Sequence, residues 1–195
     1  MSSFVYTVNV VGDEALATSI IERTVETIVD INCSVVGVAA FYSCKSLTEV
    51  NFQACTKISS NAFLACGSLS SALFPVCESV LSSAFCSCPK LTTVSFPACE
   101  YIGDSAFAKC VSLTAVSFPV CTKIVGAAFL DCSSLISVTL GASTVCSMQK
   151  STAFNRTPIK SGAGYIYVPA SLVDSYKAAT NWSLYANQIV AMDSD

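Results

Sequence analysis

Cysteine is the residue of this 195-residue chain whose type and spacing most strongly suggest chemistry. Ten of its twelve cysteines recur every eleven residues and form two series, each with a period of 22 residues. The first series is Cys33, Cys55, Cys77, Cys99 and Cys121, and the second is Cys44, Cys66, Cys88, Cys110 and Cys132. Cys86 and Cys146 lie outside both series. Such thiols can form disulfides, bind a metal, act as nucleophiles or pack as small apolar side chains.

Disulfides and metal binding both fit the spacing poorly. If the period marks stacked coils, successive cysteines of a series lie roughly 5 Å apart, but their Cβ vectors run parallel where a disulfide needs them to converge. Five members also leave one cysteine unpaired. A zinc site needs convergent Cys or His ligands at spacings such as C-x₂-C. The nearest approach is Cys86-x-Cys88, and the chain contains no histidine.

Catalysis is also poorly supported. The absence of histidine removes the commonest general base, and a reactive thiol needs an activating base or cation. Lys45 and Lys109 each adjoin a cysteine in sequence, but consecutive residues point in different directions. The thirteen carboxylates are scattered, and we interpret them as solvated loop residues. The sequence therefore predicts no catalytic residue, cofactor or metal, and it favours columns of reduced, buried thiols.

The elements that would position these thiols are internal repeats. The pair Ala-Phe recurs at steps of 22 residues, at Phe41, Phe63, Phe85, Phe107 and Phe129. Each unit reads L-x-x-V-x-F-P-x-C-x-x-I-x-x-x-A-F-x-x-C, with nine positions in register over four or five copies. Residues 47–134 form four regular units. Residues 25–46 are a degenerate leading unit, and residues 135–157 are a trailing unit with about three extra residues.

The pattern within one unit predicts its local structure. The alternation of V-x-F indicates a strand, which the following proline ends because it cannot donate to a ladder. The A-F-x-x-C-x-x-L segment has a period of three to four and favours a short helical or 3₁₀ turn. One unit cannot bury its own Phe, Leu and Ile, so the units must stack. Six coils spaced about 4.8 Å apart form a slab on the order of 30 Å long.

The repeat unit resembles the BspA-type leucine-rich repeat over residues 25–157, although that family's usual unit has about 23 residues. The family's usual Ile-Gly before Ala-Phe survives only at Ile102-Gly103. The resemblance implies a leucine-rich-repeat-like, right-handed solenoid of about six coils. One parallel β-sheet would cover one face, with short 3₁₀, helical or irregular returns on the other. It also implies a bacterial protein at the cell surface or secreted, with a role in adhesion or host-protein binding.

The two ends are predicted to cap the solenoid of residues 25–157. Residues 1–24 would form an N-terminal cap, with a strand over residues 4–11 and a short helix over residues 13–22. Residues 158–195 would form a C-terminal cap, with a strand over residues 165–168 and a helix over residues 172–180 that Ser171 begins. Some relatives end in a similar segment. The aromatic residues Tyr176 and Trp182 suit a cap better than a ligand platform.

Composition narrows the possible partners. Charged residues make up 12 % of the chain and the net charge is −3, with no basic patch, so nucleic acid is not expected. No run of about 18 apolar residues exists, so membrane insertion is not expected either. The N-terminus lacks the basic and long apolar regions of a secretory signal. The sequence alone therefore leaves localisation open, and reduced cysteines indicate a reducing or anaerobic setting.

The outward positions of the predicted strands are the candidate binding face. They are Glu49, Asn51, Ser71, Leu73, Thr93, Ser95, Ala115, Ser117, Ser137 and Thr139. This row is small, neutral and rich in hydroxyl groups. It either tiles a solvent-facing sheet or forms a flat platform for a protein or glycan partner. The absence of aromatic residues from the row argues against tight stacking on sugars.

Three functions remain to be compared. The leading hypothesis is a non-catalytic recognition or adhesion module that binds a host or bacterial surface protein. The alternative is a structural or assembly component of a surface or phage-like particle. A thiol-dependent enzyme is the third and is the least supported by the residues present. The sequence predicts neither the ligand nor the oligomeric state.

Overall fold

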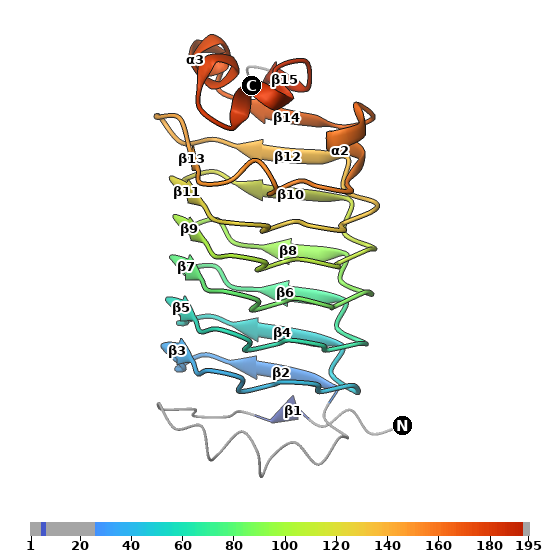
Figure 1. Cartoon of the computed structure of the whole chain (residues 1–195). Helices are drawn as coiled ribbons and strands as arrows, with labels where there is room; N and C mark the ends of the chain where they lie inside the picture. The colour runs from blue at the N-terminus through green and yellow to red at the C-terminus, as the bar shows by residue number, and fades with distance from the viewer. Residues whose placement is uncertain (1–4, 7–25, 193–195) are drawn as a thin grey trace.

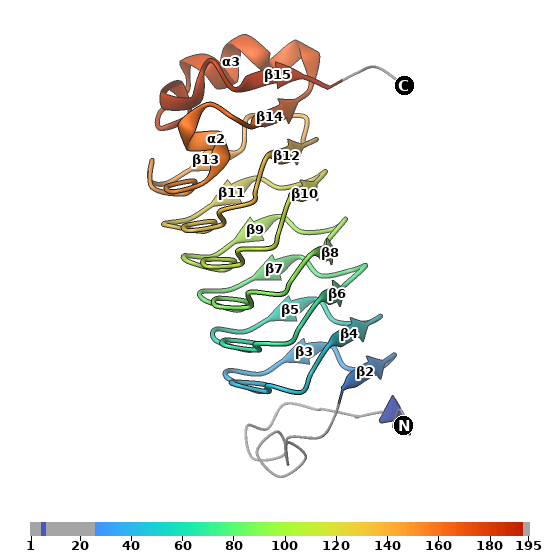
Figure 2. The same cartoon turned by 90° about the vertical axis from the view of Figure 1, so that its right-hand side faces the viewer.

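A computed structural model describes residues 5–6 and 26–192 of the chain. It is a solenoid in which six successive coils each contribute one parallel strand to each of two opposite faces (Figures 1 and 2). We call the face of longer strands face A and the face of two-residue strands face B. Face A contains β2 (Thr27–Asp30), β4 (Glu49–Phe52), β6 (Ser71–Leu73), β8 (Thr93–Ser95), β10 (Ala115–Phe118) and β12 (Ser137–Leu140). Face B contains β3 (Val35–Val36), β5 (Lys57–Ile58), β7 (Ser79–Val80), β9 (Tyr101–Ile102), β11 (Lys123–Ile124) and β13 (Ser147–Met148).

The strand register follows the sequence period. Glu49 pairs with Ser71 and Ser71 with Thr93, so equivalent positions of neighbouring coils lie side by side. The leucine-rich-repeat solenoid and its sheet are thus confirmed. Face B was not predicted as a sheet, because a two-residue strand such as Lys57–Ile58 is too short to show alternation.

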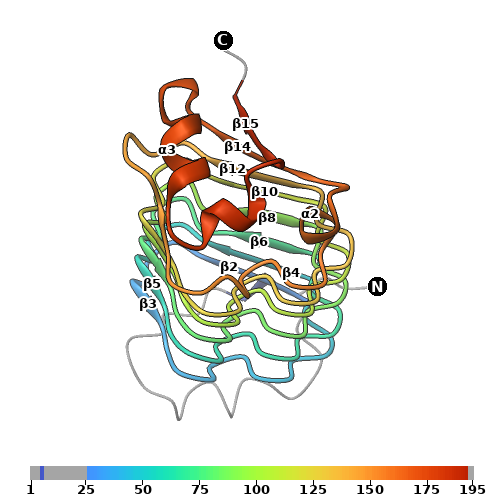
Figure 3. The ribbon, with the colours of Figure 1, turned by 45° about the horizontal axis from the view of Figure 1, so that its top comes forward.

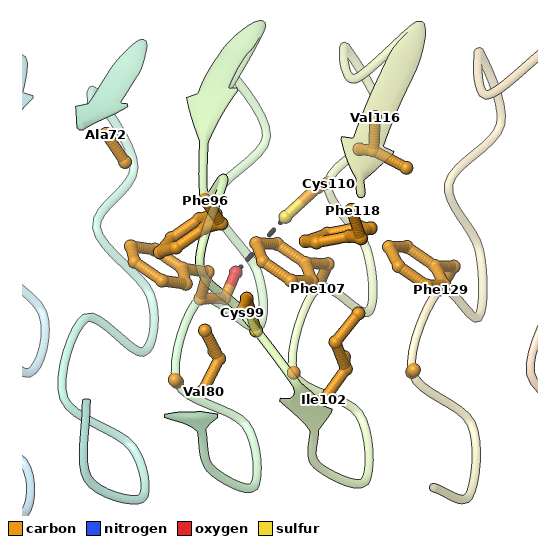
Figure 4. Packing of buried hydrophobic residues seen from close by; sticks show 14 of the residues in the cluster. Ala72, Val80, Phe96, Cys99, Ile102, Phe107, Cys110, Val116, Phe118 and Phe129 are labelled. Carbon is orange, nitrogen blue, oxygen red and sulfur yellow. Dashed lines mark hydrogen bonds between the residues drawn. The ribbon is translucent and has the colours of Figure 1, made fainter. Parts of the chain in front are cut away.

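Two columns of stacked phenylalanine rings fill the core (Figure 4). In the first column, Phe85 stacks on Phe107 with ring centroids 5.4 Å apart and planes 3° apart. In the second, Phe74 stacks on Phe96 at 5.4 Å and 8°. The columns meet edge to face, as Phe96 and Phe107 do at 5.9 Å and 66°. Both arrangements are favourable for aromatic pairs, so the repeat places each ring against others in all directions.

The returns between the two faces are stacked turns without a continuous helical or 3₁₀ ladder, which agrees with the prediction of short, irregular returns. Phe41 N–H donates to Ala62 O of the next coil at 2.7 Å, while Tyr42 N–H donates locally to Ala39 O at 3.0 Å. This alternation between inter-coil and local bonds prevents a continuous helical ladder. Ala39 and Ser43 have positive φ values of 54° and 61°, which also break a helix.

The three extra residues of the trailing unit are absorbed without breaking the stack. Ser147 pairs with Lys123, 24 residues earlier, and Phe154 stacks on Phe129, 25 residues earlier, at 5.4 Å. Cys146 comes to lie with its Sγ 3.9 Å from that of Cys121. Cys146 therefore continues the first cysteine series, although its sequence position lies outside the period.

The C-terminal segment lies across the last coil (Figure 3). It comprises α2 (Pro158–Ser161), β14 (Tyr165–Val168), η1 (Ala170–Leu172), α3 (Val173–Ala178), η2 (Trp182–Tyr185) and β15 (Ile189–Ala191). The predicted strand is confirmed as β14, which pairs with β12. Ser171 does not begin the helix. It lies inside η1, and Leu172 occupies the first capping position of α3 without a side-chain hydrogen bond.

Aromatic side chains of this segment form hydrogen bonds with backbone groups of the last coil. Trp182 Nε1 donates to Cys146 O at 2.6 Å, and Cys146 N–H donates to Tyr176 Oη at 2.9 Å. Tyr185 Oη donates to Ser151 O at 2.7 Å, and its ring meets Phe154 edge-on at 5.5 Å. At the other end, Val5–Tyr6 form β1, which pairs with β2. The helix predicted over residues 13–22 lies outside the described residues.

Phe107→Ala should lower the free energy of unfolding by roughly 3–5 kcal/mol, because it leaves a ring-sized cavity between two stacked neighbours. Phe107 is fully buried between Phe85 and Phe129. Urea unfolding followed by circular dichroism measures the change. Ile136→Ala, at an exposed strand-edge position, serves as the control. A loss below about 1 kcal/mol for Phe107→Ala would show that the packing of this ring against its stacked neighbours contributes little to the free energy of unfolding.

Candidate functional site

The strand register gathers the predicted binding residues into two parallel rows on the outer side of face A. One row contains Glu49, Ser71, Thr93, Ala115 and Ser137, and the other contains Asn51, Leu73, Ser95, Ser117 and Thr139. Residues between them, such as Val50 and Val138, are fully buried. All ten predicted residues therefore lie on one surface, with their alternate neighbours in the core.

Exposure varies along these rows. Thr93, Ser95, Ala115 and Ser117 in the middle of face A are exposed, whereas the outward residues of β4, β6 and β12 are half-buried by their neighbours. Near the N-terminal end, Gln53 Nε2 donates to Asn51 Oδ1. Glu49 is the only charged residue among the outward strand positions of face A from β2 to β14. The surface is therefore almost neutral.

Both rows extend beyond the predicted residues. Tyr165 pairs in register with Ser137, and Tyr167 with Thr139, so β14 adds two tyrosines to face A. Their ring centroids lie 6.4 Å apart, and Tyr165 is 47 % exposed. The ten predicted residues include no aromatic side chain, but the face on which they lie also carries these two rings. The alternation in Tyr-Ile-Tyr-Val is the signal of a half-buried strand, but residues 165–168 were treated only as part of a cap.

Face B differs in charge from face A. Its outward strand positions include Lys57, Tyr101 and Lys123, and Lys123 Nζ lies 5.8 Å from the centroid of the Tyr101 ring. Glu78 and Glu100 adjoin its strands and are exposed. Exposed charges of this kind are well solvated, so they do not by themselves indicate a binding site. Face A is the better candidate because it is extended, regular and nearly free of charge.

The second cysteine series donates hydrogen bonds between coils. Cys110 Sγ donates to Phe85 O of the preceding coil at 3.1 Å, as Figure 4 shows, and Cys132 Sγ donates to Phe107 O at 3.0 Å. The first series donates within its own coil, for example from Cys99 Sγ to Tyr101 O at 3.3 Å. Both series are therefore structural, since their thiols are buried and, in nine of the ten cases, donate to a backbone carbonyl.

The environment of several buried thiols opposes reactivity. All twelve cysteines are free, and only Cys86 is not buried. Burial raises the pKa of Cys33 to about 11 and the pKa values of Cys99 and Cys132 to about 12. Burial also raises the pKa of the Cys110 thiol. A nucleophilic cysteine needs a lowered pKa, so these thiols are not arranged for attack.

Asp30 is a buried carboxylate that the sequence interpretation missed. It pairs with Phe52 and thus occupies the phenylalanine position of the first described coil. Its Oδ1 accepts from Asn32 N–H at 2.8 Å and Cys33 N–H at 2.7 Å, while Oδ2 has no partner among the described residues. The description of all carboxylates as solvated loop residues was therefore wrong at this position. Its place in the 22-residue register was the available signal.

Among the described residues, no three His, Cys, Asp or Glu side chains converge so as to hold a metal ion. In the same part of the chain, no helix has the length and apolar character required to cross a membrane. The principal features of the described residues are therefore the outer surface of face A and the buried core.

Comparison with known proteins agrees with this architecture. The family model described as "BspA type Leucine rich repeat region" matches six copies, over residues 3–82 and 56–172. The chain belongs to the BspA-type leucine-rich repeat family. Repeats of this family are generally non-enzymatic, serve as protein-interaction modules and occur typically in surface-associated proteins.

A solved structure from Bacteroides ovatus supports the same fold. A leucine-rich repeat protein from Bacteroides ovatus ATCC 8483 is 19 % identical and superposes with a TM-score of 0.64, covering 87 % of this chain and 43 % of that one. The Treponema pallidum leucine-rich repeat protein is 21 % identical with a TM-score of 0.47, covering 87 % and 69 %. The chain thus spans less than half of the Bacteroides protein. A search of curated proteins finds no match.

The buried thiols predict that stability falls in alkaline solution. A thiol with a raised pKa keeps its proton in the folded chain while the unfolded chain ionises. The free energy of unfolding is therefore fully retained below about pH 9 and falls as the pH rises toward the folded values of about 11 to 12. Each such thiol contributes a slope of about 1.4 kcal/mol per pH unit.

Urea midpoints measured between pH 7 and pH 10.5 under reducing conditions test this. Cys99→Ala removes one titrating group and should make the decline less steep, and the exposed-site variant Thr93→Ala, which removes no ionisable group, should leave the slope unchanged. A midpoint that stays constant over this pH range would show that the thiols ionise equally in both states.

Proposed function

We propose that this chain is a non-catalytic recognition or adhesion module that binds a protein partner through face A. The observation that carries the proposal is the register within β2–β8 and within β10–β14, which aligns outward side chains of successive coils on one side of the solenoid. Membership of a family of protein-interaction modules supports it. The proposed partner is a host or bacterial surface protein, and the proposed location is the cell surface or the exterior.

The chemistry of face A suits such a partner. The small side chains of serine, threonine and alanine leave a flat surface that another protein can approach closely. Because the face carries little charge, binding requires little desolvation of charged groups. The exposed ring of Tyr165, with Tyr167 beside it, offers an aromatic anchor at the C-terminal end of the face. Interfaces commonly concentrate their binding energy in a few residues of this type.

Binding can be tested by immobilising the protein and measuring capture of purified host-matrix and bacterial surface proteins. Ser95→Arg places a long cation in the middle of face A, and Tyr165→Ala removes the proposed anchor. Each substitution should lower the affinity for the captured partner by about ten-fold or more. Ser79→Arg makes the same change at an outward position of face B and should bind like the unmodified protein.

The outcomes separate the alternatives. Equal losses for Ser95→Arg and Ser79→Arg would argue against face A as the binding surface. Absence of any captured partner, together with concentration-dependent association in light scattering, would favour an assembly component over an adhesion module. Circular dichroism of each variant verifies that the fold is retained.

We also propose the division of the chain into an N-terminal cap (residues 1–24), a solenoid (residues 25–157) and a C-terminal cap (residues 158–195). The capping role of the C-terminal segment is supported by Trp182, Tyr176 and Tyr185, which cover the last ring of the core and bond to backbone groups of the last coil. An uncovered last coil would expose those backbone groups and the Phe154 ring to water.

Tyr176→Phe should lower the free energy of unfolding by about 1–3 kcal/mol, because it leaves the buried Cys146 N–H without its acceptor. Tyr42→Phe removes a hydroxyl from an exposed ring and should have almost no effect. Thermal and urea unfolding of both variants provide the comparison. Equal stability of the two variants would contradict a capping contribution from the Tyr176 hydroxyl.

A further inference from the structure

Face A is interrupted in the middle of the solenoid. Its strands form one sheet in the order β1-β2-β4-β6-β8 and a second in the order β10-β12-β14-β15, and β8 is not paired with β10. The ribbons of these two strands are visibly farther apart than other neighbours on this face (Figure 1). We call the junction between β8 and β10 the seam.

Backbone hydrogen bonds identify what the seam lacks. At the neighbouring junctions, one carbonyl at the start of a strand accepts two N–H groups from the next coil. Thr48 O accepts from Ser70 and Ser71, Ser70 O accepts from Thr92 and Thr93, and Thr114 O accepts from Ile136 and Ser137. In this part of the chain Thr92 O has no corresponding bonds from Thr114 and Ala115.

Side-chain packing changes at the same place. Val94 is partly exposed, whereas the equivalent Val50 and Ala72 are fully buried. The rings of Phe96 and Phe118 lie 6.4 Å apart with planes at 22°, compared with 5.4 Å and 8° for Phe74 and Phe96. The separation therefore extends from the sheet surface into the second phenylalanine column.

The remainder of the coil interface is intact at this level. On face B, Tyr101 pairs with Lys123 as in the other coils. In the returns, Phe107 N–H donates to Ala128 O and Lys109 N–H donates to Leu130 O, both at 2.8 Å. The two halves of the solenoid are thus joined along face B and the returns, and they are separated along face A.

We propose that the seam is a hinge at which the solenoid bends. The coils from β2 to β8 and those from β10 to β14 act as two blocks that tilt about an axis along face B, which opens and closes the seam. In a repeat protein each coil contacts only its neighbours, so bending concentrates at the weakest junction. Bending changes the curvature of face A and the spacing of its rows. The proposal does not depend on a binding partner.

Distance distributions between spin labels test the hinge directly. Labels attached to genetically encoded ketone residues avoid the native thiols. One pair replaces Asn51 in β4 and Thr139 in β12, and the matched pair replaces Lys57 in β5 and Ser147 in β13. Both pairs span the same coils. The face A pair should give the broader distribution, and equal widths for the two pairs would overturn the proposal.

Proline substitutions test the missing bonds independently. Ile136→Pro removes the N–H that donates to Thr114 O at 2.9 Å, whereas Thr114→Pro occupies the equivalent position and removes an N–H without such a bond. The thermal midpoint of Ile136→Pro should fall by several degrees more than that of Thr114→Pro. Equal losses would show that Thr114 N–H is bonded in solution and that the seam is closed.

Discussion

The structure depends on one constraint, which is that every side chain in the core must pack against its own equivalents in the coils before and after it. Parallel strands hold successive coils about 4.8 Å apart, so a residue type is retained in a column only if it tolerates copies of itself at that distance. Phenylalanine does so by stacking, as the rings of Phe63 and Phe85 do at 5.0 Å. Cysteine does so because its side chain is small and its S–H finds a carbonyl within reach, as between Cys88 and Phe63 O at 3.2 Å. A charged residue would repel its copies, and the regular coils have none in their core.

The same constraint explains the chemistry at the two ends of the ring columns, where the series of stacked phenylalanines begins or stops. Asp30 replaces phenylalanine at the start of the second ring column and bonds to the backbone of the turn that follows. In later coils that turn is closed by a backbone carbonyl, as when Cys77 N–H donates to Phe74 O at 3.3 Å. At the other end, Trp182 and Tyr185 cover Phe154 with their rings and satisfy backbone groups with their polar atoms. Amphipathic aromatics suit this position because one side of each faces the core and the other meets open hydrogen-bonding groups.

Features that recur with the 22-residue period can be predicted from the sequence. Prediction fails where the period is broken or where contacts between coils decide the local structure. The face A strands, the buried columns and all ten outward residues follow from alternation and the 22-residue spacing. The local spacing of three in the returns left helical, 3₁₀ and irregular segments open, and bonds between coils such as Phe41 N–H to Ala62 O select stacked turns. Cys146 was separated from its column by an insertion, and Tyr165 and Tyr167 belong to a strand without the repeat motif. Nothing in the segment Thr92–Phe96 or Thr114–Phe118 departs from the repeat, so the seam is a property of the stacked coils.

These departures from the period bear directly on recognition. A perfectly repeating face presents the same groups at every coil, and a partner could bind it in several registers with nearly equal affinity. Specificity requires features that occur once, since discrimination is a difference between binding free energies. Face A has three such features along its length: Glu49 and Asn51 near the N-terminal end, the seam in the middle, and the tyrosine pair on β14. A partner that contacts the first and the third must span the second. Its affinity would then depend on the angle between the two blocks as well as on the residues it touches, because fixing a hinge has a cost in conformational entropy.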